Sequence, residues 1–198
     1  MEDNAASIER IIHSLLAGEV SKAHRLAEKG LPFEPLLIAG RRYRLTEAMR
    51  IFVRDGFIDR YSGDRMIFPG ILRLLAVSLP EAFPFQEHWK MSQTHMIYWH
   101  LFPTLDHIVP ISRGGSDTEG NLVCTSMLKN SAKANWTLEE LGWQLHPPGR
   151  FEEWDGLTHL FIGFTERKPE MLSTRYLKSW HKAAIAVLDR NCETARRG

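Results

Sequence analysis

The sequence has few cysteines, with only Cys124 and Cys192 among its 198 residues. Two cysteines so far apart provide neither a disulfide framework nor a Cys-x-x-Cys pair for structural zinc. No apolar run approaches the roughly 18 residues that a membrane span requires. The first 16 residues, MEDNAASIERIIHSLL, lack the basic start and the long apolar stretch of a secretory signal. We therefore expect a cytoplasmic protein without structural zinc and without a membrane partner.

Excess charge is also nearly absent, because 25 basic residues face 24 acidic ones and the net charge is +1. Proteins that bind phosphate backbones usually carry a larger basic excess. Residues 41–73 depart from this balance, with eight arginines, no lysine and four acids. The arginines are Arg41, Arg42, Arg44, Arg50, Arg54, Arg60, Arg65 and Arg73. The segment forms either a phosphate-binding surface or a solvated face with salt bridges, and the sequence leaves both open.

The pattern of apolar residues and turn signals predicts an α+β fold. Helices are expected at about 8–16, 20–28, 45–54, 70–79, 92–102 and 126–135, with two more after residue 150. Strands are expected at about 104–110 and 121–125, and Ser62-Gly63-Asp64 predicts a β-hairpin within 57–68. Thr137 with Glu140 forms a capping box. We expect an N-terminal helical extension (1–40), a central domain (41–145) and a C-terminal helical extension packed on that domain (146–198).

The stretch from Asp106 to Lys133 holds polar residues at positions that suit phosphodiester chemistry. Carboxylate and amide oxygens, such as those of Asp106 and Asn130, are ligands that Mg²⁺ accepts while keeping several waters. An unperturbed histidine side chain has a pKa of about 6.5, so near neutral pH His107 can take a proton from water. Neighbours on a strand point to opposite faces, so the strand must end or bulge at these residues for both to serve one site. Asn121 can donate to one loop carbonyl and accept from one loop amide, which would pin the loop.

These residues form the pattern DHIVP…GG…N…L…N…K, which closely resembles the motif of HNH nucleases, also called the ββα-metal or His-Me finger. The pattern is also similar to the HNH domain of the CRISPR RNA-guided DNA-cutting effector. The resemblance covers about residues 104–135. It implies that His107 is the general base, that Asp106 and Asn130 bind the metal, and that Asn121 is the structural asparagine. It also implies that Lys133 contacts a phosphate.

The resemblance extends to the predicted architecture. The stretch RYSGDRMIF looks like the hairpin that many HNH domains place before their core, but it lacks the zinc-binding cysteines of those relatives. The expected fold is a ββα-metal core with an upstream β-hairpin, surrounded by N- and C-terminal helices.

The function that follows is a Mg²⁺- or Mn²⁺-dependent endonuclease that hydrolyses DNA, with double-stranded DNA as the expected substrate. Arg41, Arg42, Arg44 and Arg113 are the candidate nucleic-acid contacts. RNA stays open as a substrate because metal-assisted attack by water needs no 2′-hydroxyl. Two alternatives also stay open, namely a non-catalytic nucleic-acid or protein binding module and an RNA-cleaving toxin effector. The biological roles open to such an enzyme are restriction or defence and the nuclease of a mobile element. A homodimer with two sites would fit double-strand cleavage.

Overall fold

The computed structural model describes residues 3–33 and 43–195 of the chain. These residues belong to two compact units, Met1–Leu37 and Ile38–Gly198. None of the described helices is long and apolar enough to cross a membrane. Arg41 and Arg42, two of the predicted nucleic-acid contacts, lie outside the described residues.

The first unit is a pair of helices, α1 (Asn4–Leu16) and α2 (Val20–Gly30), which pack against each other. Asp3 caps α1 by accepting a hydrogen bond from the backbone of its first turn at 3.0 Å. Gly18 lies in the connection at φ +75°, a conformation that favours glycine. The buried residues of this pair are all small, namely Ser7, Ser14 and Ala23. Both helices lie where the sequence predicted them.

The second unit contains a two-stranded antiparallel sheet, the one sheet within residues 43–195. Its strands are β1 (Pro103–His107) and β2 (Leu122–Ser126). The last pair in register joins His107 to Leu122, and no bulge interrupts the pairing. Strand β1 ends earlier than predicted, because the N–H and the carbonyl of Val109 bond to the side chain of Asn121 and not to a strand. The loop contains two short 3₁₀ turns, Ile111–Arg113 and Glu119–Asn121.

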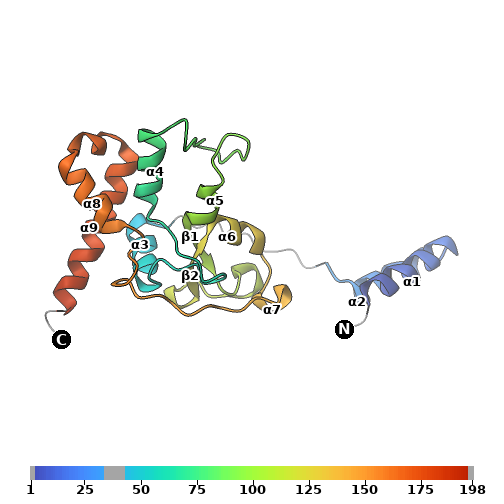
Figure 1. Cartoon of the computed structure of the whole chain (residues 1–198). Coiled ribbons are helices and arrows are strands. Elements are labelled where there is room, and N and C mark those ends of the chain that lie inside the picture. The colour runs from blue at the N-terminus through green and yellow to red at the C-terminus, as the bar shows by residue number, and fades with distance from the viewer. Residues whose placement is uncertain (1–2, 34–42, 196–198) are drawn as a thin grey trace. The chain divides into compact units, whose positions relative to one another are not determined.

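Helix α6 (Met127–Lys133) follows β2 directly and completes a ββα unit, which we define as β1, β2 and α6. Figure 1 shows α6 beside the two strands. The hydroxyl of Ser126 caps α6 by accepting from the N–H of Lys129 at 3.1 Å. Helix α7 (Leu138–Leu141) starts with the predicted capping box, in which the N–H of Thr137 donates to Glu140 Oε2 at 2.8 Å. The α+β prediction is therefore confirmed.

The predicted hairpin of residues 57–68 is a loop with a single β-bridge between Ile58 and Arg65. Two paired strands were expected, and this part of the prediction is wrong. The loop closes on itself only through this bridge and through the N–H groups of Asp59 and Met66, which donate to the carbonyls of Asp64 and Phe57. The ladder goes no further because the middle of the loop is bound to β2. The N–H of Arg60 donates to the carbonyl of Cys124 at 2.9 Å, which removes it from any ladder within the loop.

Two buried carboxylates fasten this loop to β2. Asp59 is 1% exposed and accepts from the hydroxyl of Thr125 and from the N–H groups of Tyr61 and Ser126, each at 2.9 Å. Asp55 is fully buried and accepts from the N–H of Cys124 at 2.8 Å. Buried ionised groups are stable only when their hydrogen bonds are made, so these contacts fix the loop on the strand.

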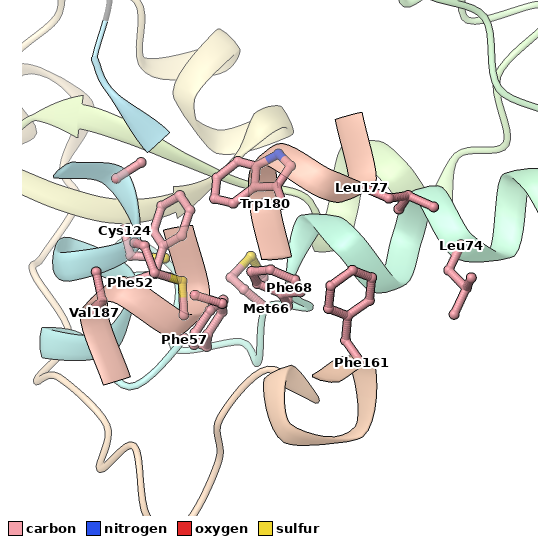
Figure 2. Close-up of a cluster of buried hydrophobic side chains, with 13 residues drawn as sticks. Phe52, Phe57, Met66, Phe68, Leu74, Cys124, Phe161, Leu177, Trp180 and Val187 are labelled. Carbon is pink, nitrogen blue, oxygen red and sulfur yellow. The ribbon is translucent and has the colours of Figure 1, made fainter. Parts of the chain in front are cut away.

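The hydrophobic core lies where four helices pack beside β2 (Figure 2). The helices are α3 (Leu45–Arg54), α4 (Pro69–Ser78), α8 (Thr158–Arg167) and α9 (Arg175–Ala195), with a 3₁₀ turn at Pro169–Ser173. The ring of Phe68 lies 5.1 Å from Phe161 and 5.6 Å from Trp180. Cys124 joins β2 to this core, and burial raises the pKa of its thiol well above the usual value. The C-terminal helices therefore share one core with the ββα unit.

Helix α5 (Ile97–Leu101) is shorter than the predicted helix at 92–102. The ring of His95 accepts from the N–H of Ile97 at 3.1 Å and so begins the helix there. The hydroxyl of Thr94 accepts from the N–H of Gln86 at 3.1 Å, which holds the preceding residues in turns.

The Asp59 contacts predict a large and local stability effect. Asp59→Ala should lower the free energy of unfolding by roughly 3 kcal/mol, because three donors lose a charged acceptor in a buried site. Urea denaturation of the full chain measures this change. Asp64→Ala, in the same loop but exposed, should change it by less than about 0.5 kcal/mol. Equal effects of the two substitutions would contradict the fastening role of Asp59.

Candidate active site

The loop after β1 is held by the side chain of Asn121. Its Oδ1 accepts from the N–H of Val109 at 2.9 Å, and its Nδ2 donates to the carbonyls of Val109 and Ser116 at 2.8 Å each. The loop passes so close that a Cβ on Gly115 would lie 1.9 Å from the carbonyl oxygen of Val109. Only glycine fits there, so Asn121 and Gly115 together set the path of the chain that follows His107.

His107 is the last residue of β1, and its side chain is 16% exposed. Its Nε2 lies 3.1 Å from Oδ1 of Asp117 and 3.2 Å from the hydroxyl of Tyr43. The partner of this ring nitrogen is therefore a carboxylate from the loop after β1.

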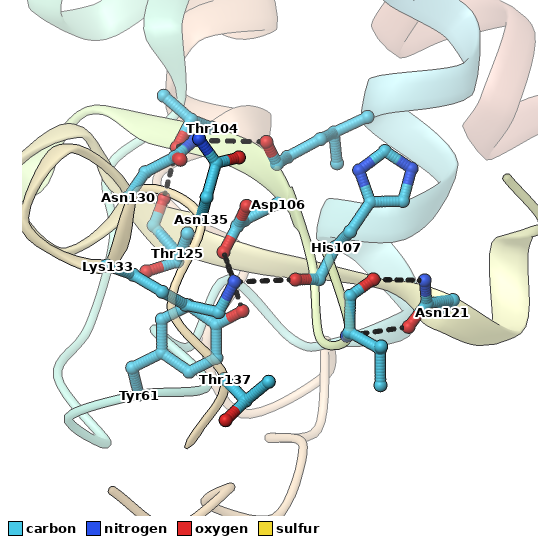
Figure 3. Close-up of polar contacts among 12 residues, drawn as sticks. Tyr61, Thr104, Asp106, His107, Asn121, Thr125, Asn130, Lys133, Asn135 and Thr137 are labelled. Atoms are coloured by element: carbon cyan, nitrogen blue, oxygen red, sulfur yellow. Dashed lines mark hydrogen bonds and ion pairs between the residues drawn. The ribbon is translucent and has the colours of Figure 1, made fainter. Parts of the chain in front are cut away.

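Asp106 contacts a different set of residues, because neighbours on a strand face opposite ways. Its Oδ2 accepts from the hydroxyl of Tyr61 at 2.7 Å and lies 2.9 Å from Nζ of Lys133. Burial raises the pKa of Tyr61, and the nearby carboxylate of Asp106 raises it further, so the phenol stays a hydrogen-bond donor. Figure 3 shows Tyr61 and Lys133 meeting at Asp106, while the ring of His107 points away from them.

Lys133 is fully buried, and its ammonium donates to the carbonyl of His107 at 2.8 Å as well as pairing with Asp106. The ammonium also lies 5.7 Å from the centre of the Tyr61 ring. In this position it faces the carboxylate and the end of β1. A phosphate contact, which the resemblance implied for Lys133, would require the side chain to leave this buried place.

Asn130 lies one turn before Lys133 on the face of α6 that packs on β1. Its Nδ2 donates to the hydroxyl of Thr104 and to the carbonyl of Leu105, both at 3.0 Å. These bonds fix the amide beside the residue that precedes Asp106. They also leave its Oδ1 without a hydrogen bond among the described residues.

The donor chemistry of this pair suits a hard divalent cation. Oδ1 of Asp106, like Oδ1 of Asn130, makes no hydrogen bond with the described residues. Both oxygens keep solvent contact, since the one fully buried side-chain N or O atom without a partner in residues 3–33 and 43–195 is Nε1 of Trp99. No cluster of three His, Cys, Asp or Glu side chains that could hold a metal occurs within these ranges. A cation here would therefore have two protein ligands and complete its shell with water or substrate oxygens, as Mg²⁺ commonly does.

The arginine-rich segment is largely committed to internal contacts. Arg50 pairs with Glu119 at 2.9 Å, and Arg54 donates to the carbonyls of Glu119 and Leu122 at 2.7 and 2.6 Å. Arg60 pairs with Asp55 at 3.2 Å. The salt-bridge alternative thus holds for these three side chains, which brace the loop and β2.

Two other predicted nucleic-acid contacts, Arg44 and Arg113, lie within the described residues. Arg44 is exposed at the start of α3, where its N–H donates to Glu47. Arg113 pairs with Glu140 at 3.3 Å on the surface, and the side chain is 40% exposed. Exposed ion pairs contribute little, so a phosphate could replace Glu140 at low cost.

A family model described as HNH endonuclease matches residues 94–138. The match supports the HNH endonuclease family for this segment. The match spans less than a quarter of the chain and contains β1, the glycine loop, β2 and α6. It does not separate the CRISPR effector from other HNH domains. Comparisons with curated proteins and with solved structures gave no match.

Four residues at the HNH segment were missed as site residues by the sequence analysis, namely Tyr43, Asp55, Asp59 and Tyr61. The residues that they contact in the HNH segment follow 45 to 74 positions later in the chain, so all four lie outside the matched range. An Asp-x-x-x-Asp spacing on an aromatic-rich loop is too common to indicate such contacts.

The contacts of Asn121 predict that its loss destabilises the loop. Asn121→Ala removes three hydrogen bonds to the backbone and should lower the free energy of unfolding by about 1–3 kcal/mol, which a thermal melt would show as a lower Tm. Asn135→Ala is the matched control, because Asn135 is exposed and accepts one bond, from Ser112, at 3.2 Å. An unchanged Tm for Asn121→Ala would contradict the pin.

Proposed function

We propose that this protein is a metal-dependent endonuclease that hydrolyses DNA phosphodiester bonds, with His107 as general base. The observation that carries the proposal is the end of β1. There His107, with a carboxylate at one ring nitrogen, directly follows Asp106 in a segment that matches HNH endonucleases, and Asp106 and Asn130 each keep one side-chain oxygen without a hydrogen bond to the described residues.

The residues that would hold the metal are Asp106 and Asn130, through the two Oδ1 atoms. Mg²⁺ or Mn²⁺ bound there would supply positive charge to the phosphate and to the leaving 3′ oxygen. Tyr61 and Lys133 hold the other carboxylate oxygen of Asp106, so the carboxylate keeps one orientation.

His107 would take the proton from the attacking water, and the ring would carry it while the leaving oxygen departs. Asn121 and Lys133 hold the backbone on which this ring stands, through Val109 and through the carbonyl of His107. The products would carry 5′-phosphate and 3′-hydroxyl ends.

Double-stranded DNA is the proposed substrate, and cleavage of both strands would need two sites, which a homodimer supplies. The proposed setting is the cytoplasm, in restriction of foreign DNA or in a mobile element. Attack by water uses no 2′-hydroxyl, so the same chemistry would cut RNA in a toxin.

One observation favours a second function, a non-catalytic binding module on the same scaffold. The ammonium of Lys133 already pairs with Oδ2 of Asp106 at 2.9 Å and balances the charge of the carboxylate without a metal. A protein of this kind would bind nucleic acid or a partner protein but would neither bind Mn²⁺ nor nick a plasmid.

The general-base assignment predicts the effect of His107→Ala. The rate of plasmid nicking in Mg²⁺ should fall by ~10²–10⁴, because no other group replaces the base, while the far-ultraviolet spectrum stays unchanged. His159→Ala is the control, since His159 is exposed and contacts Asp155, which lies just before the helix of His159. A His107→Ala protein that cuts at the wild-type rate would rule out this assignment.

The metal assignment predicts weaker cation binding in Asn130→Ala. The dissociation constant for Mn²⁺, measured by calorimetry, should rise roughly ten- to hundredfold, because one ligand is lost and Asp106 loses an ordered neighbour. Asn135→Ala should bind Mn²⁺ as the wild type does. Equal Mn²⁺ affinity in Asn130→Ala and wild type would place the metal elsewhere.

A further inference from the structure

We infer that Asp117 and Tyr43 position His107 and fix its tautomer, with the ring proton on Nε2 and the lone pair on Nδ1. The inference deepens the proposed function, because it names the nitrogen that would receive the proton from water. Neither residue belongs to the predicted set of catalytic and metal-binding residues.

Three polar atoms lie close together, namely Nε2 of His107, one carboxylate oxygen of Asp117 and the hydroxyl oxygen of Tyr43. Nε2 of His107 lies 3.1 Å from Oδ1 of Asp117 and 3.2 Å from the hydroxyl oxygen of Tyr43. The hydroxyl oxygen lies 3.4 Å from the same Oδ1. The distance from Nε2 to Asp117 is that of an ordinary hydrogen bond, whereas both contacts of the Tyr43 hydroxyl are longer, so the carboxylate has the strongest influence on where the ring proton lies.

The carboxylate decides how the hydrogen atoms are arranged. An ionised carboxylate only accepts, so each neighbour within reach must donate to it. A bare lone pair on Nε2 would face the negative oxygen at 3.1 Å and be repelled. The favourable arrangement has Nε2–H donating to Asp117, with the hydroxyl of Tyr43 donating to the same oxygen.

A neutral imidazole that carries its proton on Nε2 presents a lone pair on Nδ1. Nδ1 of His107 makes no hydrogen bond with any residue of the described ranges. The ring nitrogen that could accept a proton from water is thus Nδ1, and the choice follows from the acid at the other nitrogen.

The loop holds Asp117 in place through Asn121. Nδ2 of Asn121 donates to the carbonyl of Ser116, the residue before Asp117, and to the carbonyl of Val109, two residues after His107. One amide therefore fixes both the backbone that carries the base and the backbone that carries its acceptor. Asp117 acts through His107 and is a positioning residue.

The test reads the tautomer directly. Histidine labelled with ¹⁵N gives distinct ring shifts for the two tautomers in a two-bond proton–nitrogen spectrum, and the signals of His107 are those lost in His107→Gln. In the metal-free, full-length wild-type protein, at a pH high enough for the imidazole to be neutral, we expect the Nε2–H pattern for His107. Asp117→Asn should shift His107 toward the Nδ1–H pattern, because an amide N–H can donate to Nε2.

Activity gives a second readout. By analogy with the groups that orient histidines at metal sites, Asp117→Asn should lower kcat for plasmid nicking by roughly ten- to hundredfold with KM unchanged. Asp117→Glu restores a carboxylate and should recover part of kcat. Glu119→Gln is the control in the same loop, since Glu119 pairs with Arg50 and should leave the tautomer unchanged.

An Nδ1–H pattern in the wild type, or an unchanged pattern in Asp117→Asn, would overturn the inference. The spectrum needs neither metal nor substrate. An inactive wild-type protein would therefore refute the proposed function, while the tautomer pattern alone would still decide for or against the positioning by Asp117.

Discussion

The hydrogen bonds that backbone N–H groups of β2 donate to two buried carboxylates are the contacts on which the rest of the second unit depends. A two-stranded sheet is marginal in water without further packing. Here Asp55 and Asp59 bond to the N–H groups of Cys124 and Ser126, and Cys124 lies in the core formed by the helices. The short sheet thereby joins a larger folded body. The end of β1, where the candidate site lies, is held at a fixed place because its partner strand cannot move.

Each face of this strand end receives one tyrosine from the segment before β1. On one face Tyr61 and Lys133 orient Asp106, and Asn130 lies beside it on α6. On the other face Tyr43 and Asp117 surround His107. The strand has no bulge, and the loop folds back directly after it, where Asn121 bonds to the backbone of Val109. The segment 43–66 is thus part of the site although the family match begins at residue 94.

The sequence predicted what depends on neighbours along the chain and missed what depends on distant ones. The cap at Ser126 and the capping box at Thr137 are set by residues three positions apart, and both were predictable. Tyr61 lies 45 residues from Asp106, and Tyr43 lies 64 residues from His107, so no local pattern marks either contact. The hairpin was mispredicted for the same reason, since its backbone pairs with β2. The charge pattern could not distinguish a phosphate surface from arginines that brace the fold, because both require the same residues.

The central claim is that one divalent cation binds between Asp106 and Asn130 at the end of β1. Anomalous diffraction from a crystal of the full chain soaked in Mn²⁺ tests it most directly. We expect one strong anomalous peak, from a Mn²⁺ ion bound by Oδ1 of both residues, with His107 across the end of the strand from it. Peaks elsewhere, with Lys133 still paired to Asp106 and no density between the two oxygens, would contradict the account.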